Sequence, residues 1–139
     1  MKLLIPMLLA AALAAPLASA QTFDCSFPRQ GANEWIRSRI VVTFTGDQVT
    51  VFDSLINQEK GGPIPATVQK NTDTRLTLRW KLKGVKTSLG YGPSLNYSLS
   101  YFKQRNKATA NLNAPGIDIL NAFGESPEYY SAQGTCQRR

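Results

Sequence analysis

The chain has 139 residues, with 16 Lys and Arg against 9 Asp and Glu, so its formal net charge at pH 7 is +7. This length is typical of one small domain. The chain contains no His and only two Cys, which excludes a Ser-His-Asp triad, a His-ligated metal site and a four-thiolate zinc site. No glycine pattern matches a dinucleotide-binding or phosphate-binding loop, and we therefore expect neither a metal nor a cofactor.

Residues 1–20 have the features of a cleavable signal peptide. Lys2 is the only charged residue in this stretch, and an apolar run rich in Leu and Ala follows it. The stretch ends in Ala-Ser-Ala, the small-x-small pattern that signal peptidase accepts. We expect cleavage after Ala20 and a single mature domain over 21–139, located in the periplasm or secreted from a bacterium. No second long apolar segment follows, so we expect no transmembrane segment in the mature chain.

The two cysteines stand near the two ends of the predicted mature domain. Cys25 is the fifth residue after the predicted cleavage site, and Cys136 is the fourth residue from the C-terminus. In an oxidising compartment one intramolecular disulfide is the simplest pairing, while free thiols or pairing between chains are the alternatives. The bond would bring the two alpha carbons within about 6 Å of each other. This suits a closed barrel, or a sheet whose terminal strands pair.

The first half of the domain has the period-two pattern of short strands. Residues 40–45 are rich in β-branched side chains, and a Gly-Asp turn separates them from a similar run at 48–52, as in a β-hairpin. A Gly-Gly-Pro loop at 61–63 precedes a short predicted strand at 66–70.

The second half has the clearest alternation. Apolar residues alternate with basic and polar ones over 75–83, and with Asn and Ser over 95–103. Another strand is predicted at 108–113, and a last one at 131–137 would carry Cys136. The segments 88–94 and 121–130 have the composition of loops.

Seven or eight short strands at roughly ten-residue spacing predict an all-β fold, a small antiparallel meander that forms a barrel or sandwich. No segment has a convincing amphipathic helix, although residues 32–38 or 117–123 have the length for one turn. The leader, the cysteine placement and the strand pattern resemble the small exported β-proteins of Gram-negative bacteria. This resemblance implies an architecture and a compartment, and no functional motif accompanies it.

A basic face is the strongest candidate for a functional site. The cations on strand 75–83 project from one side, and antiparallel pairing with 95–103 would bring the following polar turn near the same end. A positive field of this kind attracts anions and steers their encounter, although it would also suit a solvated outer face that guards against aggregation. The predicted patch comprises Arg75, Arg79, Lys81, Lys83, Lys103, Arg105 and Lys107.

Aromatic side chains are the second candidate. Trp80, Tyr97 and Tyr101 occupy inward positions and are expected in the core. Aromatic residues in the predicted loops are better placed to contact a ligand; these are Tyr91, Phe123, Tyr129 and Tyr130.

The Asp and Glu residues are scattered, mostly at turns, and no pair suggests the cleft that general acid–base hydrolysis needs. We therefore expect no enzyme, but a binding or envelope-associated module that contacts an anionic envelope component or an acidic protein. Nucleic acid is not expected, because the chain is predicted to be exported and lacks a nucleic-acid-binding aromatic motif. The alternative is a lipocalin-like carrier of a small apolar ligand. Bulky inward residues argue against the large cavity that such a carrier needs.

Overall fold

Most of the molecule consists of strands whose side chains alternate between the interior and the outer surface. The structure is a computed structural model and describes residues 20–31, 34–87, 90–92, 94–114 and 129–139. The predicted leader lies outside these ranges except for Ala20. The described residues form eleven strands and one short helix: β1 (Ala20–Ser26), β2 (Arg39–Thr45), β3 (Gln48–Phe52), α1 (Ser54–Lys60), β4 (Ile64–Pro65), β5 (Thr67–Asn71), β6 (Arg75–Leu82), β7 (Lys86–Thr87), β8 (Gly90–Tyr91), β9 (Leu95–Phe102), β10 (Lys107–Asn113) and β11 (Tyr129–Arg138).

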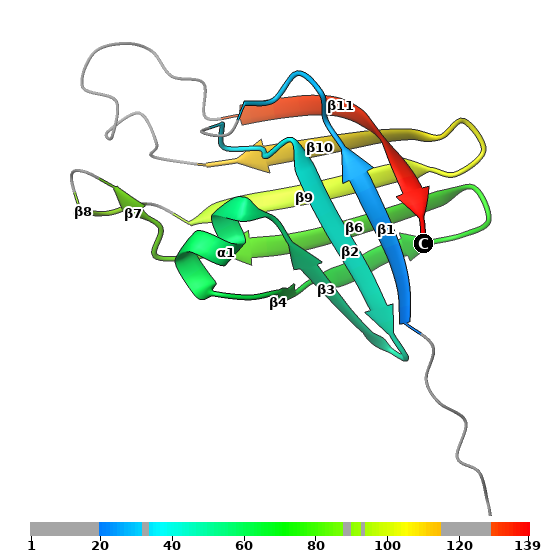
Figure 1. Ribbon diagram of the computed structural model, residues 1–139, viewed down its shortest axis with the longest axis horizontal. Coiled ribbons are helices and arrows are strands. Elements are labelled where there is room, and N and C mark those ends of the chain that lie inside the picture. Colours follow the sequence, from blue (N-terminus) through cyan, green and yellow to red (C-terminus); the bar gives the residue numbers. More distant parts are fainter. Residues whose placement is uncertain (1–19, 32–33, 88–89, 93, 115–128) are drawn as a thin grey trace, which may run out of the picture.

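Nine of these strands form one antiparallel sheet that curls into a nearly closed barrel (Figure 1). Their order is β4-β3-β2-β1-β11-β10-β9-β6-β5, and β7 and β8 form a separate hairpin. The two edge strands, β4 and β5, are separated in the chain only by Ala66, whose amide nitrogen donates to the Val49 carbonyl oxygen at 3.0 Å. When β4 and β5 count as one bent strand, the barrel has eight positions. The predicted antiparallel meander of seven or eight strands is therefore confirmed.

The curled sheet has two sides, whose strands cross at a steep angle in Figure 1. We call β1 to β4 with the end of β11 sheet A, and β5, β6, β9 and β10 with the start of β11 sheet B. Residues 129–134 of β11 pair with β10, whereas residues 135–138 pair with β1. A strand that bends from one sheet into the other is typical of orthogonal packing. β11 therefore forms one corner of the barrel, and the β4–β5 junction forms another.

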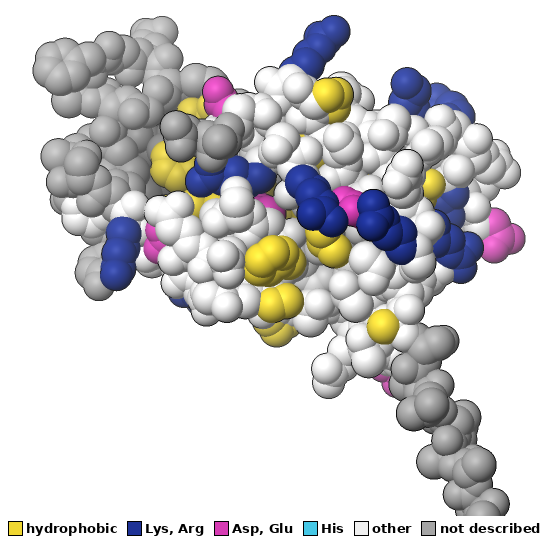
Figure 2. Space-filling view, in the orientation of Figure 1, with side chains coloured by type: hydrophobic (Ala, Val, Ile, Leu, Met, Phe, Trp, Pro, Cys, Tyr) yellow, Lys and Arg dark blue, Asp and Glu magenta, His cyan; other side chains and the backbone are white. Residues whose placement is uncertain are grey.

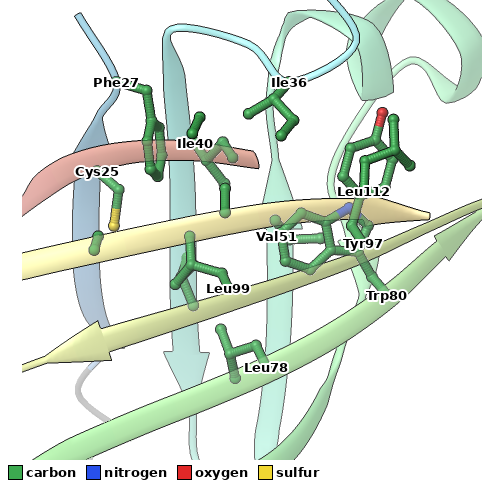
Figure 3. Packing of buried hydrophobic residues seen from close by; sticks show 14 of the residues in the cluster. Cys25, Phe27, Ile36, Ile40, Val51, Leu78, Trp80, Tyr97, Leu99 and Leu112 are labelled. Atoms are coloured by element: carbon green, nitrogen blue, oxygen red, sulfur yellow. The ribbon is translucent and has the colours of Figure 1, made fainter. Parts of the chain in front are cut away.

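Inward side chains from both sheets occupy the interior (Figure 3). The rings of Trp80 and Tyr97 stack with their centroids 5.3 Å apart and an interplanar angle of 5°. The Tyr97 hydroxyl donates to the Trp35 carbonyl oxygen at 2.7 Å, so this buried phenol has a partner. The predicted inward positions are all buried: Trp80, Tyr97, Tyr101, Ala108 and Ala110.

The predicted disulfide between Cys25 and Cys136 joins the first and last strands. The two residues lie directly opposite each other in the β1–β11 register, with their alpha carbons 3.9 Å apart. Backbone hydrogen bonds between Thr22 and Arg139, at 3.2 and 2.7 Å, extend the same seam. Both cysteines are buried in the core. The covalent bond and the strand pairing therefore close the barrel at the same place.

The short helix α1 lies where no helix was predicted. The turn of helix considered at 32–38 is wrong for the described residues 34–38, none of which is helical, and 117–123 lies outside the described residues. Asp53 caps α1, because its Oδ1 accepts from the Ile56 amide nitrogen at 2.8 Å. Gly61 ends the helix in the left-handed region, with φ at 76°.

Three other features of the strands differ from the prediction. β1 was not predicted as a strand, although its backbone completes the sheet between β2 and β11. β11 begins at Tyr129, two residues before the predicted start. The β7–β8 hairpin extends into the segment predicted as a loop. Within the described part of the chain, no helix combines the length and apolar character that a membrane crossing requires.

Candidate functional site

The described strands of sheet B carry positive charge on their outer face. Outward positions alternate with buried ones along β6, β9 and β10. The strand residues of sheet B include no Asp or Glu. Their five cations are Lys70, Arg75, Arg79, Lys81 and Lys107.

A shallow groove of about 670 Å³ crosses this face. Its two charged residues, Arg79 and Lys81, come from β6, and the other polar side chains come from the neighbouring strands. No carboxylate lines it among the described residues. The lining is formed by Thr67, Arg79, Trp80, Lys81, Asn96, Tyr97, Ser98, Asn111, Asn113 and Tyr129. We call this hollow the sheet B groove.

Strand register places the groove residues in two rows that run across the strands. The first row is Lys81–Asn96–Asn113–Tyr129, and the second is Arg79–Ser98–Asn111–Ser131. Side chains that lie directly opposite on neighbouring strands are close enough to act on one ligand. The rows therefore combine two cations, three amides, hydroxyl groups and one phenol on a single surface.

A second cluster of cations surrounds Phe102. The guanidinium carbons of Arg75 and Arg105 lie 5.2 and 5.1 Å from the centre of its ring, within the range of cation–π attraction. A hollow of about 290 Å³ here is also lined by Lys70. Lys107 lies opposite Phe102 in the β9–β10 register. This cluster belongs to the same outer face as the sheet B groove.

Two members of the predicted patch, Lys103 and Lys83, lie outside the strands of sheet B. The Lys103 amide nitrogen donates to the Thr74 carbonyl oxygen at 2.9 Å, so its backbone lies beside the start of β6. Its side chain, however, donates to Asn71 Oδ1 at 2.9 Å and to the Thr72 carbonyl oxygen at 2.6 Å. The ammonium group is thereby held beside a different hollow, of about 230 Å³. Lys83 is exposed and follows the last residue of β6.

The four candidate aromatic residues are not equivalent. Tyr129 and Tyr130 were predicted in a loop, but both belong to β11, which pairs with β10 from its first residue. The Tyr129 side chain is 58% exposed and lines the sheet B groove, whereas Tyr130 packs against the core. Tyr91 contributes its backbone to β8, and Phe123 lies outside the described residues.

Sheet A presents a different pattern of charge. In Figure 2, acidic side chains lie among Lys and Arg on the face where β1 and β2 pass in front of sheet B in Figure 1. Asp24 on β1 accepts two hydrogen bonds from the Arg39 guanidinium, at 2.9 and 2.7 Å. Arg139 Nη2 lies 3.3 Å from the same carboxylate. The hydrogen bond from Arg39 lowers the pKa of Asp24, and this charge is therefore already paired within the chain.

The one buried carboxylate among the described residues has a structural role. Asp53 is 4% exposed, and burial raises its pKa above the usual range, against the opposing hydrogen bonds of the α1 amides. Because this side chain caps α1, its carboxylate stabilises the helix and is not a candidate functional group. No group of three or more Cys, Asp or Glu side chains in the described ranges is placed to hold a metal ion.

Sequence reasoning missed the polar centre of the groove. Asn96, Asn111 and Asn113 were treated as the solvent-facing half of their strands, and nothing distinguished them from other polar positions. The available signal was the period-two placement of amides on two strands joined by a short turn. Such strands pair, which predicts that these amides lie opposite one another.

Comparisons with protein-family models, with curated proteins and with solved structures find no match for this chain.

Proposed function

We propose that this protein is an exported, non-enzymatic binding domain that contacts an anionic partner of the cell envelope through the outer face of sheet B. The observation that carries the proposal is the charge of that face: its strands hold five cations and no carboxylate. On sheet A, by contrast, Asp24 forms an ion pair with Arg39 and also lies close to Arg139. Cations without neighbouring acids produce the positive field that attracts an anion.

The interior supports the choice of a surface site. A lipocalin-like carrier requires a ligand cavity between its strands. The inward positions of β6 and β9 are instead occupied by Leu, Trp and Tyr, and the stacked rings of Trp80 and Tyr97 are both buried (Figure 3). The described residues form hollows on the outer face of sheet B instead.

The disulfide supports export. Disulfides form and persist in the periplasm and outside the cell, and are rare in the reducing cytosol. A leader over 1–20, cleaved after Ala20, would deliver the domain over 21–139 to such a compartment.

The proposal is tested by binding measurements on the exported protein, purified from cells that express the full chain. Polyphosphate, polyglutamate and oligogalacturonate serve as anionic probes, and isothermal titration calorimetry gives the affinity at several salt concentrations. The double variant Arg79→Gln/Lys81→Gln removes both charges of the sheet B groove. We expect it to bind at least one of these anions about tenfold more weakly, with a smaller dependence on salt.

A matched control removes the same net charge elsewhere. Arg29→Gln/Lys60→Gln also replaces one Arg and one Lys, both exposed, and neither residue lines a groove on sheet B. This variant should keep nearly the full affinity. Equal weakening by the two double variants would mean that net charge alone drives binding, and it would overturn the proposal that this face is the binding site. The absence of binding to every anion would also overturn the proposal.

A further inference from the structure

We infer that the sheet B groove binds a carboxylated polysaccharide, which extends the proposed function by naming the class of anion. The argument rests on three properties of the groove. Its charge lies at one end, its free amides lie in the middle, and an exposed aromatic ring lies at the other end.

The two rows of the groove set its length. The row Lys81–Asn96–Asn113–Tyr129 crosses from β6 through β9 and β10 to β11. Three spacings between neighbouring strands amount to about 14 Å. An extended ligand that lies across the strands can therefore reach the cation at one end and the phenol ring at the other. A single small anion would contact only the β6 end.

The amide side chains of the groove have no hydrogen-bond partner among the described residues, unlike the polar side chains of the next row. In that row Thr109 donates to Gln133 at 3.1 Å, and the Thr77 and Ser100 hydroxyls lie 3.4 Å apart. The side-chain amides of the groove enter no such hydrogen bond with the described residues; these are Asn96, Asn111 and Asn113. Two neighbouring rows of one sheet thus differ in whether their polar side chains already have partners.

Free amides suit a sugar. Each Asn side chain offers two donors and one acceptor, and a sugar hydroxyl can both donate and accept. Tyr129 is 58% exposed, and an aromatic ring can cover the apolar face of a sugar ring while its hydroxyl stays in water. These three amides and the tyrosine together recognise a carbohydrate better than they recognise a compact anion.

The charged end suits a carboxylate. The Arg79 guanidinium can hold a carboxylate through two parallel hydrogen bonds, and Lys81 lies on the same side of β6, two residues further along. An anion of higher charge density, such as polyphosphate, would bind preferentially at the cluster around Phe102, where Lys70, Arg75 and Arg105 line one hollow. An acidic protein would need a larger interface with an apolar centre, whereas polar side chains dominate this groove.

The test uses the exported protein and four probes. These are oligogalacturonate as the carboxylated sugar, maltohexaose as a neutral sugar, polyphosphate and polyglutamate. We expect oligogalacturonate to bind more tightly than maltohexaose. Asn111→Ala and Tyr129→Ala should each weaken oligogalacturonate binding about tenfold and leave polyphosphate binding unchanged. Tyr129→Phe should keep the affinity, because the ring that covers the sugar is retained.

A matched control lies on the same strand. Thr109→Ala changes an outward position of β10 two residues before Asn111, in the row whose hydroxyl groups are already paired. It should leave every affinity unchanged. Circular dichroism and thermal unfolding establish that each variant is folded.

The outcomes separate the two proposals. If polyphosphate or polyglutamate binds through Arg79 and Lys81, and Asn111→Ala and Tyr129→Ala have no effect on any probe, the polysaccharide inference is overturned and the anion-binding face stands. If maltohexaose binds as tightly as oligogalacturonate, the requirement for charge is wrong. If no probe binds, both proposals fail.

Discussion

Gly134 lies at the corner where β11 leaves β10 and begins to pair with β1. At this point the chain segment that follows β1 passes directly over β11. A Cβ atom on residue 134 would collide with the Ser26 carbonyl oxygen and would lie 2.8 Å from Phe27 Cδ1. Because the collision involves backbone, a rotamer change cannot relieve it. This corner therefore requires a residue without a side chain.

We expect Gly134→Ala to lower the free energy of unfolding by about 1–3 kcal/mol, the usual cost of inserting a carbon into packed structure. Urea unfolding followed by circular dichroism measures the change. Gly62→Ala is the control, because a Cβ there has nothing within 4 Å, and it should change the stability by less than about 1 kcal/mol. If Gly134→Ala is as stable as the wild type, the Ser26 carbonyl oxygen does not lie as close to residue 134 as the structure places it.

Asp24 on β1 connects β2 and the residue that follows β11 through one carboxylate. It lies on β1, accepts from Arg39 at the start of β2, and is approached by Arg139 just after β11. It thus spans the seam between the first and last strands on the outside, while the disulfide spans it on the inside. The electrostatic contribution of this seam depends on pH, because the hydrogen bond from Arg39 lowers the pKa of Asp24.

The sign of that dependence follows from the lowered pKa. The folded state favours the ionised carboxylate, so its contribution is fully present above the ordinary pKa of 3.8 and is lost as the pH falls through the lowered value. Asp24→Asn should therefore be less stable than the wild type at neutral pH, and the difference should shrink in acid. Thermal unfolding across this range measures the effect. A stability difference between Asp24→Asn and the wild type that stays constant with pH would contradict the stabilising role of the ionised Asp24 carboxylate.

The disulfide acts on the molecule as a whole. It links residues 111 positions apart in the chain, so in the chain-entropy model it removes much of the freedom of the unfolded state. The same link joins β1 and β11, which are the first and last strands of the described residues and are neighbours in the barrel. Its effect on stability is therefore large compared with that of any other single contact across this seam.

We expect the double variant Cys25→Ala/Cys136→Ala to lose on the order of 4 kcal/mol of unfolding free energy, and less if the reduced unfolded chain keeps residual structure. Chemical unfolding of the wild type and of the variant, both without reductant, gives the difference. Because both cysteines are buried, alkylation of the wild type should require reduction together with denaturant. Equal stability of the two proteins would contradict this account.

At the level of single elements, the sequence predicted the strands whose buried and exposed residues alternate regularly. The strands β6, β9 and β10 were predicted because each buries alternate side chains and exposes the others. The helix α1 was missed because only Leu55 and Ile56 are buried in its seven residues, too few to establish a helical period. Its visible signals were Asp53 before it and Gly61 after it, the residues that cap its two ends.

By itself the sequence predicted the all-β class of fold and the pairing of the two cysteines, because alternation acts over a few residues and two cysteines leave one intramolecular choice. The expected count of seven or eight strands left both a barrel and a sandwich open. Only the tertiary structure decided the composition of the groove. Register between separate strands placed Asn96, Asn113 and Tyr129 in line with Lys81. Local hydrogen bonds held the Lys103 side chain beside a different hollow. These relations depend on the register between strands and on contacts between turns, which the alternation within any one strand does not specify.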